Sequence, residues 1–225
     1  MYELLRKFLN KVGLDIHKLK VRSGSMYYPL LKYRDEIDLV IDVGVADGTP
    51  DLYRAFPRTK KLLIEPLDTF VQRLMNKRKS LNAEVIKACA SDKTGNSTFF
   101  IRNKQSTSSV NQGSSFNQKI ELSTERLDII CAKYLTGNEV ICLKIDTEGS
   151  EIRVLKGADK ILRQCEVVVA EATLYPTLSG SNSMFELIDY MAKKGFKIQD
   201  FVNIRKAGYC FDQCDIIFVK SNESI

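Results

Sequence analysis

Residues 38–50 read DLVIDVGVADGTP. The first six of these residues form a short, β-branched and almost continuously apolar run, which is typical of a strand covered on both faces. A turn with Gly44 and Gly48 follows, and Thr49-Pro50 supplies a helix cap with proline at the first helical position. A strand, a glycine turn and a helix in this order predict the first unit of an α/β fold.

The same alternation continues along the chain. Further apolar runs predict strands at 61–64, 83–88, 140–145 and 166–170, and two closing strands at 196–201 and 215–219. Ser183 and Glu186 form a capping box that opens one of the intervening helices, and Gly195 ends it. This pattern predicts a doubly wound, mostly parallel sheet with helices on both faces. A smaller strand pair is expected between 97–102 and 120–124.

The chain has 225 residues, 44% of them hydrophobic and 28% charged, which is typical of a globular protein with one sizeable core. We divide it into an N-terminal helical extension, residues 1–37, and a main α/β domain, residues 38–225. Apolar residues at helical spacing predict an amphipathic helix over residues 2–12. We expect this helix to pack on the main domain, with a dimer contact as the alternative. His17, the only histidine, belongs to no motif and is interpreted as incidental.

Composition also bears on the cellular setting. No apolar run approaches the roughly 20 residues of a membrane helix, and the N-terminus lacks the apolar core and cleavage site of a signal peptide. We therefore expect a cytoplasmic protein with reduced cysteines and no membrane partner. The net charge of +6 is spread along the chain, so no nucleic-acid partner is indicated.

Ligands of doubly wound sheets bind at the carboxyl ends of the strands, so the residues at those ends form the candidate site. Gly44 ends the first strand and allows a ligand to approach the backbone, although the turn matches neither the dinucleotide fingerprint nor a phosphate loop. Glu65 ends the second strand, and its carboxylate suits the two hydroxyls of a ribose. The alternative for Glu65 is a cap on a helix that begins at Pro66. Ser91 and Asp92 end the third strand, where they either bond an adenine edge or form a plain turn.

The fourth strand ends in three carboxylates within six residues, Asp146-Thr147-Glu148-Gly149-Ser150-Glu151. Acidic residues favour the positive end of a helix dipole, which accounts for Glu151 but less naturally for Asp146. Glu171 ends the fifth strand at the same edge of the predicted sheet. The sequence therefore gathers carboxylates where a ligand is expected.

These residues occur in ordered blocks that together resemble the FkbM family of S-adenosylmethionine-dependent methyltransferases. The blocks are Ile41-Asp42-Val43-Gly44, Glu65-Pro66, Ala90-Ser91-Asp92, Glu125-Arg126-Leu127-Asp128 and the segment Lys144–Ala158. The most specific part is Ile145–Ala158, whereas Val45-Ala46-Asp47 departs from the usual family pattern. The resemblance covers about residues 38–172. It implies a class I methyltransferase (Rossmann-like) fold for residues 38–225, with a seven-stranded sheet whose last strand is antiparallel.

The resemblance also implies a cofactor and an activity. S-adenosylmethionine would be the methyl donor, with its methionine half against Gly44, its ribose on Glu65 and its adenine beside Ser91 and Asp92. Asp42 and Asp146 would border the methyl-transfer site and contact the donor. The implied reaction is O-methylation, commonly of a sugar hydroxyl in a glycan or a glycosylated metabolite.

A sugar hydroxyl is a poor nucleophile unless a base takes its proton as the methyl group is transferred. Asp146 is the first candidate for this catalytic base, and Glu148 is the second. In an alternative arrangement, Asp146, Glu148 and Glu171 hold a Mg²⁺ ion that orients two acceptor oxygens.

Acceptor choice is expected to lie in three polar loops at the same edge, residues 103–119, 175–182 and 203–213. In these loops Tyr175 and Tyr209 are candidates for stacking on a sugar ring, and Arg205 and Lys206 for binding an acidic group on it. Two other functional classes remain open from the sequence. One is a methyltransferase that acts on RNA, lipid or protein, and the other is a non-catalytic binding module with the same fold.

Overall fold

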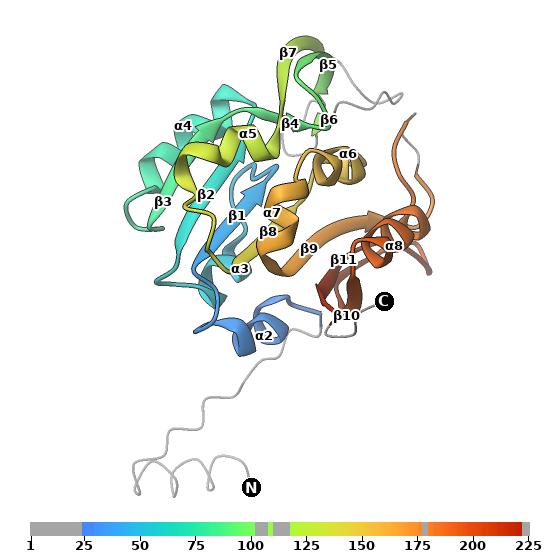
Figure 1. Cartoon of the computed structure of the whole chain (residues 1–225). Helices are drawn as coiled ribbons and strands as arrows, with labels where there is room; N and C mark the ends of the chain where they lie inside the picture. The colour runs from blue at the N-terminus through green and yellow to red at the C-terminus, as the bar shows by residue number, and fades with distance from the viewer. Residues whose placement is uncertain (1–23, 102–107, 110–117, 177–179, 222–225) are drawn as a thin grey trace, which may run out of the picture.

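The computed structural model describes residues 24–101, 108–109, 118–176 and 180–221. Within these residues, seven strands form a central sheet in the order β10-β11-β9-β8-β1-β2-β3 (Figure 1). The strands are β1 Leu39–Val43, β2 Lys60–Glu65, β3 Ala83–Lys87, β8 Ile141–Ile145, β9 Cys165–Thr173, β10 Phe196–Ala207 and β11 Cys210–Lys220. Neighbouring strands from β9 to β3 run parallel, and β11 is antiparallel to both β9 and β10. This topology confirms the predicted doubly wound sheet and its antiparallel last strand.

Helices cover both faces of the sheet, and each face has its own apolar core. One core joins the sheet to α5 Leu127–Cys131, α6 Glu151–Lys156, α7 Asp159–Gln164 and α8 Met184–Lys193. The other joins it to α2 Tyr27–Leu30, the 3-10 helix η1 Leu31–Tyr33, α3 Pro50–Ala55 and α4 Asp68–Lys77. Every residue of β1 and of β8 is buried, which explains why their apolar runs are continuous rather than alternating.

A second, smaller sheet lies over one end of the central sheet (Figure 1). Its strands are β4 Cys89–Ser91, β5 Gly95–Ile101, β6 Ser108–Ser109 and β7 Gln118–Arg126, in the order β4-β7-β5-β6. The antiparallel pairing of β5 with β7 confirms the strand pair expected there. α5 follows β7 directly. The 3-10 helix η2 Ala132–Tyr134 comes after α5 and precedes β8 of the central sheet.

The predicted loop at 203–213 is wrong. β10 continues to Ala207 and β11 begins at Cys210, so this segment is the end of a long hairpin that turns at Gly208 and Tyr209. Register shifts interrupt the pairing between Val202 and Lys206, and β10 is an edge strand with mostly exposed side chains. Bulges and an exposed edge remove the regular apolar alternation by which strands are detected.

The helix predicted over residues 2–12, and His17, lie outside the described residues, as does most of segment 103–119. Residues 24–37 contain α2 and η1, and Met26, Leu30 and Tyr33 are buried in the core beside α3. The division at residue 37 stays a prediction. None of the helices in the described residues combines the length and the apolar character that crossing a membrane requires.

Candidate active site

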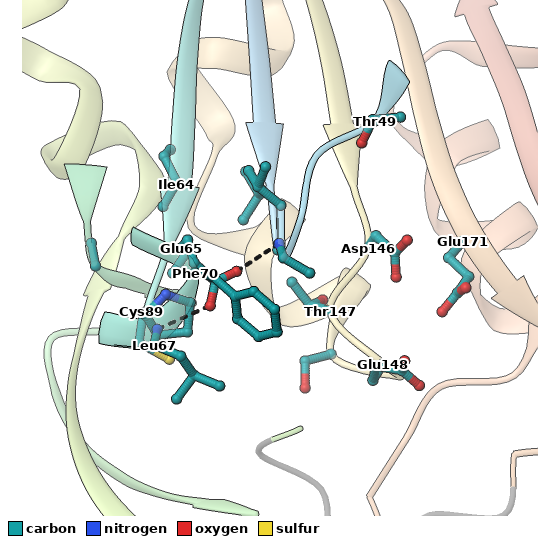
Figure 2. Close-up of a pocket in the computed structure, with 18 of the residues that line it drawn as sticks. Thr49, Ile64, Glu65, Leu67, Phe70, Cys89, Asp146, Thr147, Glu148 and Glu171 are labelled. Atoms are coloured by element: carbon teal, nitrogen blue, oxygen red, sulfur yellow. Dashed lines mark hydrogen bonds between the residues drawn. The ribbon is translucent and has the colours of Figure 1, made fainter. Parts of the chain in front are cut away.

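The carboxyl ends of β1, β2, β8 and β9 meet at one edge of the central sheet and line a cavity of about 400 Å³, called here the first cavity (Figure 2). Its wall contains Gly44, Glu65 and Ser91 from the predicted donor site, and Asp146, Glu148 and Glu171 from the predicted methyl-transfer site. Sequence reasoning from strand ends therefore brought most of its candidates to the same place.

Gly44 is needed for a reason other than ligand approach. Its φ angle is +77°, and a Cβ atom at this position would lie 1.8 Å from the backbone oxygen of Asp146. Its amide donates a hydrogen bond to the carbonyl oxygen of Ile64 at 3.0 Å. The turn after β1 is therefore packed directly against the end of β8, and only glycine fits between them.

Glu65 ties the glycine turn to the end of β2. Its buried carboxylate accepts hydrogen bonds from the backbone amides of Ala46 and Leu67, both at 2.9 Å (Figure 2). Burial raises the pKa of Glu65 to about 7, although the two amide hydrogen bonds act in the opposite direction. α4 begins only at Asp68, with Leu67 as its N-cap, so the alternative of a helix that starts at Pro66 is wrong.

Beyond Glu65 the first cavity becomes apolar. Leu67, Phe70, Cys89 and Phe99 line it and form a small core cluster of their own. Sequence reasoning assigned none of them to the site. Phe70 had a signal, because it lies in the first turn of the helix that follows the carboxylate at the end of β2. Phe99 had none, since it reaches the cavity through the pairing of β5 with β7.

Ser91 and Asp92 have different positions. Ser91 lines the first cavity, whereas Asp92 is not among the described residues that line it. The Ser91 hydroxyl donates a hydrogen bond to Asp92 at 3.1 Å, so Asp92 orients Ser91 from behind. Direct contact of Asp92 with the donor stays a prediction.

Asp42 also lies away from the cavity wall. It is completely buried beneath the turn, and the Tyr53 hydroxyl donates a hydrogen bond to its Oδ2 at 2.7 Å. Burial raises the pKa of Asp42, against the attraction of Lys144 and the hydrogen bond from Tyr53. Because Asp42 is not among the described lining residues of the first cavity, its predicted contact with the donor is replaced by a role in fixing the turn and α3.

Three carboxylates stand together at the other side of the cavity. Asp146, Glu148 and Glu171 each offer an oxygen, and these oxygens lie within 4.8 Å of one another (Figure 2). Glu148 has a φ angle of +51°, an uncommon conformation for a residue other than glycine. Burial raises the pKa of Glu171 well above its ordinary range, and the charges of Asp146 and Glu148 raise it further.

A buried lysine lies beneath these carboxylates. Lys144 points from β8 to the carboxylates of Asp146 and Asp215, with Nζ–O distances of 3.1 and 3.6 Å. Burial lowers the pKa of Lys144, but the attraction of Asp146 and Asp215 outweighs it and the net shift is upward. Lys144 interrupts an otherwise apolar strand, and this was the signal from which a role for it could have been inferred.

Glu151 supports the loop between β8 and α6. Its buried carboxylate accepts hydrogen bonds at 3.0 Å from the backbone amides of Thr147 and Gly149. The Asn182 side chain donates a further hydrogen bond to it at 3.3 Å. Glu151 therefore holds the loop that carries Asp146 and Glu148, which is more specific than the predicted attraction to a helix dipole.

A second cavity, of about 530 Å³, adjoins the first on the side of β10 and β11. Arg205 lines both cavities, whereas Lys206 is not among the described lining residues of either. Tyr175 and Tyr209 are strongly exposed and do not belong to the described walls of the two cavities. Of the four residues proposed for acceptor contacts, only Arg205 lies at the site.

A family model described as the methyltransferase FkbM domain matches residues 42–198. This chain belongs to the FkbM methyltransferase family. The match confirms the family that the blocks from Ile41 to Ala158 indicate. No curated protein sequence matches the chain significantly.

Solved structures agree with this assignment at the level of the fold. Methyltransferase FkbM from Methylobacillus flagellatus superposes with a TM-score of 0.51 at 15% identity, over 84% of this chain and 50% of that one. The chain thus spans half the length of the Methylobacillus protein. An O-methyltransferase from Bacillus cereus, solved with S-adenosylhomocysteine, superposes with a TM-score of 0.50 at 13% identity, over 97% of this chain and 90% of that one. These likenesses confirm the class I methyltransferase fold of this FkbM domain.

Proposed function

We propose that this FkbM protein transfers the methyl group of S-adenosylmethionine to a hydroxyl oxygen of a sugar. The observation that carries the donor assignment is the position of Glu65. Its carboxylate lies in the wall of the first cavity between the glycine turn and the apolar group of Leu67, Phe70 and Phe99. A carboxylate suits the ribose diol, and an apolar pocket suits the adenine ring.

Charge supports the same placement of the donor. S-adenosylmethionine carries a cationic sulfonium, whose attraction to carboxylates is strong in a cavity shielded from water. Asp146, Glu148 and Glu171 line the end of the first cavity opposite the adenine pocket. The Bacillus cereus O-methyltransferase of the same fold binds the demethylated product of this donor. We therefore place the methyl group of the donor beside these three carboxylates.

Transfer to a hydroxyl oxygen then needs a proton acceptor. We assign this role to Asp146 first and to Glu148 second, because both side chains reach the cavity from the loop after β8. Lys144 stabilises the Asp146 carboxylate by an ion pair from below, while about a third of the Asp146 side chain stays exposed. A positioned base of this kind contributes roughly 10²- to 10⁴-fold to the rate.

The same carboxylates suit Mg²⁺, which prefers oxygen ligands. Asp146, Glu148 and Glu171 would hold the ion with one oxygen each, and their oxygens are close enough together to share one ligand. Bound there, the ion would orient acceptor oxygens. Loss of activity on chelation and its recovery with Mg²⁺ would support this version, and full activity in the presence of a chelator would refute it.

The first test is calorimetry of S-adenosylmethionine and S-adenosylhomocysteine with the purified protein. We expect binding of both, and a loss of about 10- to 100-fold in affinity for Glu65→Ala, because a hydrogen-bonded charge is removed. Glu84→Ala is the matched control, since Glu84 is an exposed carboxylate on neighbouring β3. Equal affinities for the two variants would remove the ribose assignment. Absence of binding to the folded wild-type protein would favour the non-catalytic module instead.

The second test separates chemistry from binding. Asp146→Asn should lower kcat by about 10²-fold or more while the Kd for S-adenosylmethionine changes only a few-fold, because the asparagine amide cannot accept the hydroxyl proton. Asp189→Asn is the control, since the Asp189 side chain is exposed on the outer face of α8. A fully active Asp146→Asn enzyme would end the role of Asp146 as base. Methyl transfer to RNA, lipid or protein rather than to sugars would favour the other functional class.

A further inference from the structure

The second cavity lies beside the proposed methyl-transfer position. The inference drawn from it rests on the proposed function. Asp146, Glu171 and Arg205 line both cavities, so a molecule in the second cavity borders the end of the first that holds the carboxylates. The remaining wall comes from Lys144 of β8 and from three other parts of the chain: the turn and start of α3, the β10–β11 hairpin and Met26 ahead of α2.

This chamber is held together by contacts between those parts. The backbone N–H of Asn203 donates a hydrogen bond to the carbonyl oxygen of Gly24, which holds the segment before α2 on β10. The Ser25 hydroxyl donates to Asp51 at 2.5 Å, which joins the same segment to α3. Met26 is buried and closes the wall between them. These contacts fix the wall of the second cavity, which stays open to solvent on one side.

Carboxylates dominate the charged groups in its wall. The lining residues with a negative charge are Asp51, Asp146, Glu171 and Asp215, and those with a positive charge are Lys144 and Arg205. The Lys144 ammonium is already held between two of these carboxylates. Four carboxylates thus face two cations in the described wall of this cavity. An anionic ligand would meet a surplus of like charge.

The hydrogen-bonding groups of the wall suit hydroxyl groups. Asp215 is buried and accepts a hydrogen bond from the Asn203 side chain at 2.7 Å, which fixes the direction of its carboxylate. Gln213 and Thr49 add an amide and a hydroxyl to the same chamber. Carboxylate oxygens accept hydrogen bonds from sugar hydroxyls, and amides both donate and accept. Ile204 and Met26 supply apolar surface for the carbon face of a ring.

From these observations we propose that the second cavity is the acceptor subsite and selects an uncharged sugar ring, with Asp215 and Gln213 as the residues that read its hydroxyls. Phosphorylated sugars, uronic acids and nucleic acid are disfavoured there, because their anionic groups would lie beside Asp51, Asp215 and Asp146. In the described wall, Arg205 is the one cation besides Lys144, which is already paired with two of these carboxylates. Arg205 lies at the junction of the two cavities, and it does not reverse this balance.

The experiment measures transfer of a labelled methyl group from S-adenosylmethionine to matched sets of acceptors. Each set contains the methyl glycoside of a neutral hexose or deoxyhexose, its 6-phosphate where one exists and the corresponding uronic acid. We expect kcat/KM to be at least about tenfold higher for the neutral member of each set than for its anionic members. A tenfold loss is what roughly one unfavourable contact between like charges costs. Equal or better use of the anionic members would overturn the proposal.

Variants of the hairpin locate the effect. Asp215→Asn and Gln213→Leu should each raise the acceptor KM by about tenfold, because a hydrogen bond to the sugar is lost, and leave the Kd for S-adenosylmethionine within about twofold. Asp212→Asn is the matched control, since Asp212 lies on the same hairpin and is not part of the described wall of either cavity. Gln213→Leu keeps the test valid if Asp215→Asn fails to fold.

The outcomes separate this inference from the proposed function. A folded protein that binds no S-adenosylmethionine contradicts the proposed function itself. A protein that binds the donor but methylates no sugar, neutral or anionic, contradicts the sugar acceptor of the proposed function. A protein that methylates the anionic sugars as well as or better than the neutral ones, or one whose acceptor KM is unchanged in both hairpin variants, overturns the acceptor subsite alone.

Discussion

The affinity for S-adenosylmethionine should depend on the ionisation of Glu65. Burial raises the pKa of this carboxyl to about 7. The hydroxyls of a ribose donate hydrogen bonds, so the carboxylate form is the one that holds them. With this pKa, the ionised fraction falls from roughly nine-tenths at pH 8 to roughly one-tenth at pH 6. We therefore expect the Kd of the wild-type protein to rise about tenfold between pH 8 and pH 6, or about 1.4 kcal/mol.

Calorimetry at pH 6, 7 and 8 tests this expectation. Below pH 7 donor binding should release about one proton, which repeating the titration in buffers of different ionisation enthalpy detects. The α-amino group of the donor titrates near pH 8 in its own right, so Glu65→Gln is the control that subtracts its contribution. The variant should bind more weakly and should lack the part of the pH dependence that belongs to Glu65. A wild-type Kd that is constant from pH 6 to pH 8, or that changes equally in Glu65→Gln, would refute the reasoning.

The raised pKa of Glu65 also makes the stability of the ligand-free protein depend on pH. Burial raises the pKa of Glu65 from its ordinary 4.5 to about 7, so the folded state binds the proton more tightly than the unfolded state. Its contribution to the free energy of unfolding is fully present below about pH 4.5 and is lost as the pH rises to about 7. The loss is at most about 3 kcal/mol. Donor binding at pH 8 thus uses a carboxylate whose charge the empty fold opposes.

Two substitutions test the packing beneath the site by urea unfolding. Gly44→Ala should lower the free energy of unfolding by more than about 3 kcal/mol, because its Cβ would lie 1.8 Å from the backbone oxygen of Asp146. Gly137→Ala is the control: its φ is +98° but no atom lies within 4 Å of its Cβ position, so it should cost only about 1–2 kcal/mol. Lys144→Met should cost about 3–5 kcal/mol, because it leaves the buried carboxylate of Asp215 and the partly exposed one of Asp146 without their cation. Lys193→Met, in an exposed ion pair, should cost less than about 1 kcal/mol. Equal losses within either pair would contradict the corresponding explanation.

The central sheet could be predicted because its information is local. Strands such as β1 and β8 are buried along their whole length, so their apolar runs mark them without knowledge of their partners. The topology of such a sheet then places the strand ends at one edge, which is how Glu65 and Asp146 were brought to one cavity. Each of these steps needs only neighbouring residues and a general rule of the fold.

What the sequence did not reveal depends on contacts between distant segments. Phe99 enters the site through the pairing of β5 with β7, and Asp215 becomes part of a cavity wall through the β10–β11 hairpin. Neither has a local pattern that indicates a ligand. Asp42 misled for the opposite reason, because it lies one residue before the end of β1, close to the glycine turn, but its side chain is completely buried. The position of a residue along its strand determines how close it lies to the ligand-binding edge of the sheet. The burial of its side chain determines whether it can contact a ligand there.

The structure also explains why the FkbM motif after β8 contains residues that lie outside the described walls of both cavities. Gly157, near its end, has a Cβ position 2.0 Å from the backbone oxygen of Ser91, so this glycine lets the end of α6 pack on β4. β4 in turn carries Ser91 into the wall of the first cavity. Glu151 holds the loop that presents Asp146. One motif therefore places both the carboxylates and the opposite wall of the donor pocket.

Gly44 and Asp146 join these two functions in a single contact. Because the backbone oxygen of Asp146 occupies the space where a Cβ of residue 44 would lie, the donor turn cannot shift without moving the proposed base. If Gly44→Ala folds at low temperature, its loss should therefore appear in kcat as well as in the Kd for S-adenosylmethionine, because a misplacement of about 1 Å at the reacting atoms costs about 10²-fold in rate. A variant that is impaired in donor affinity alone, with kcat intact at saturating donor, would show that the turn and the base are positioned independently.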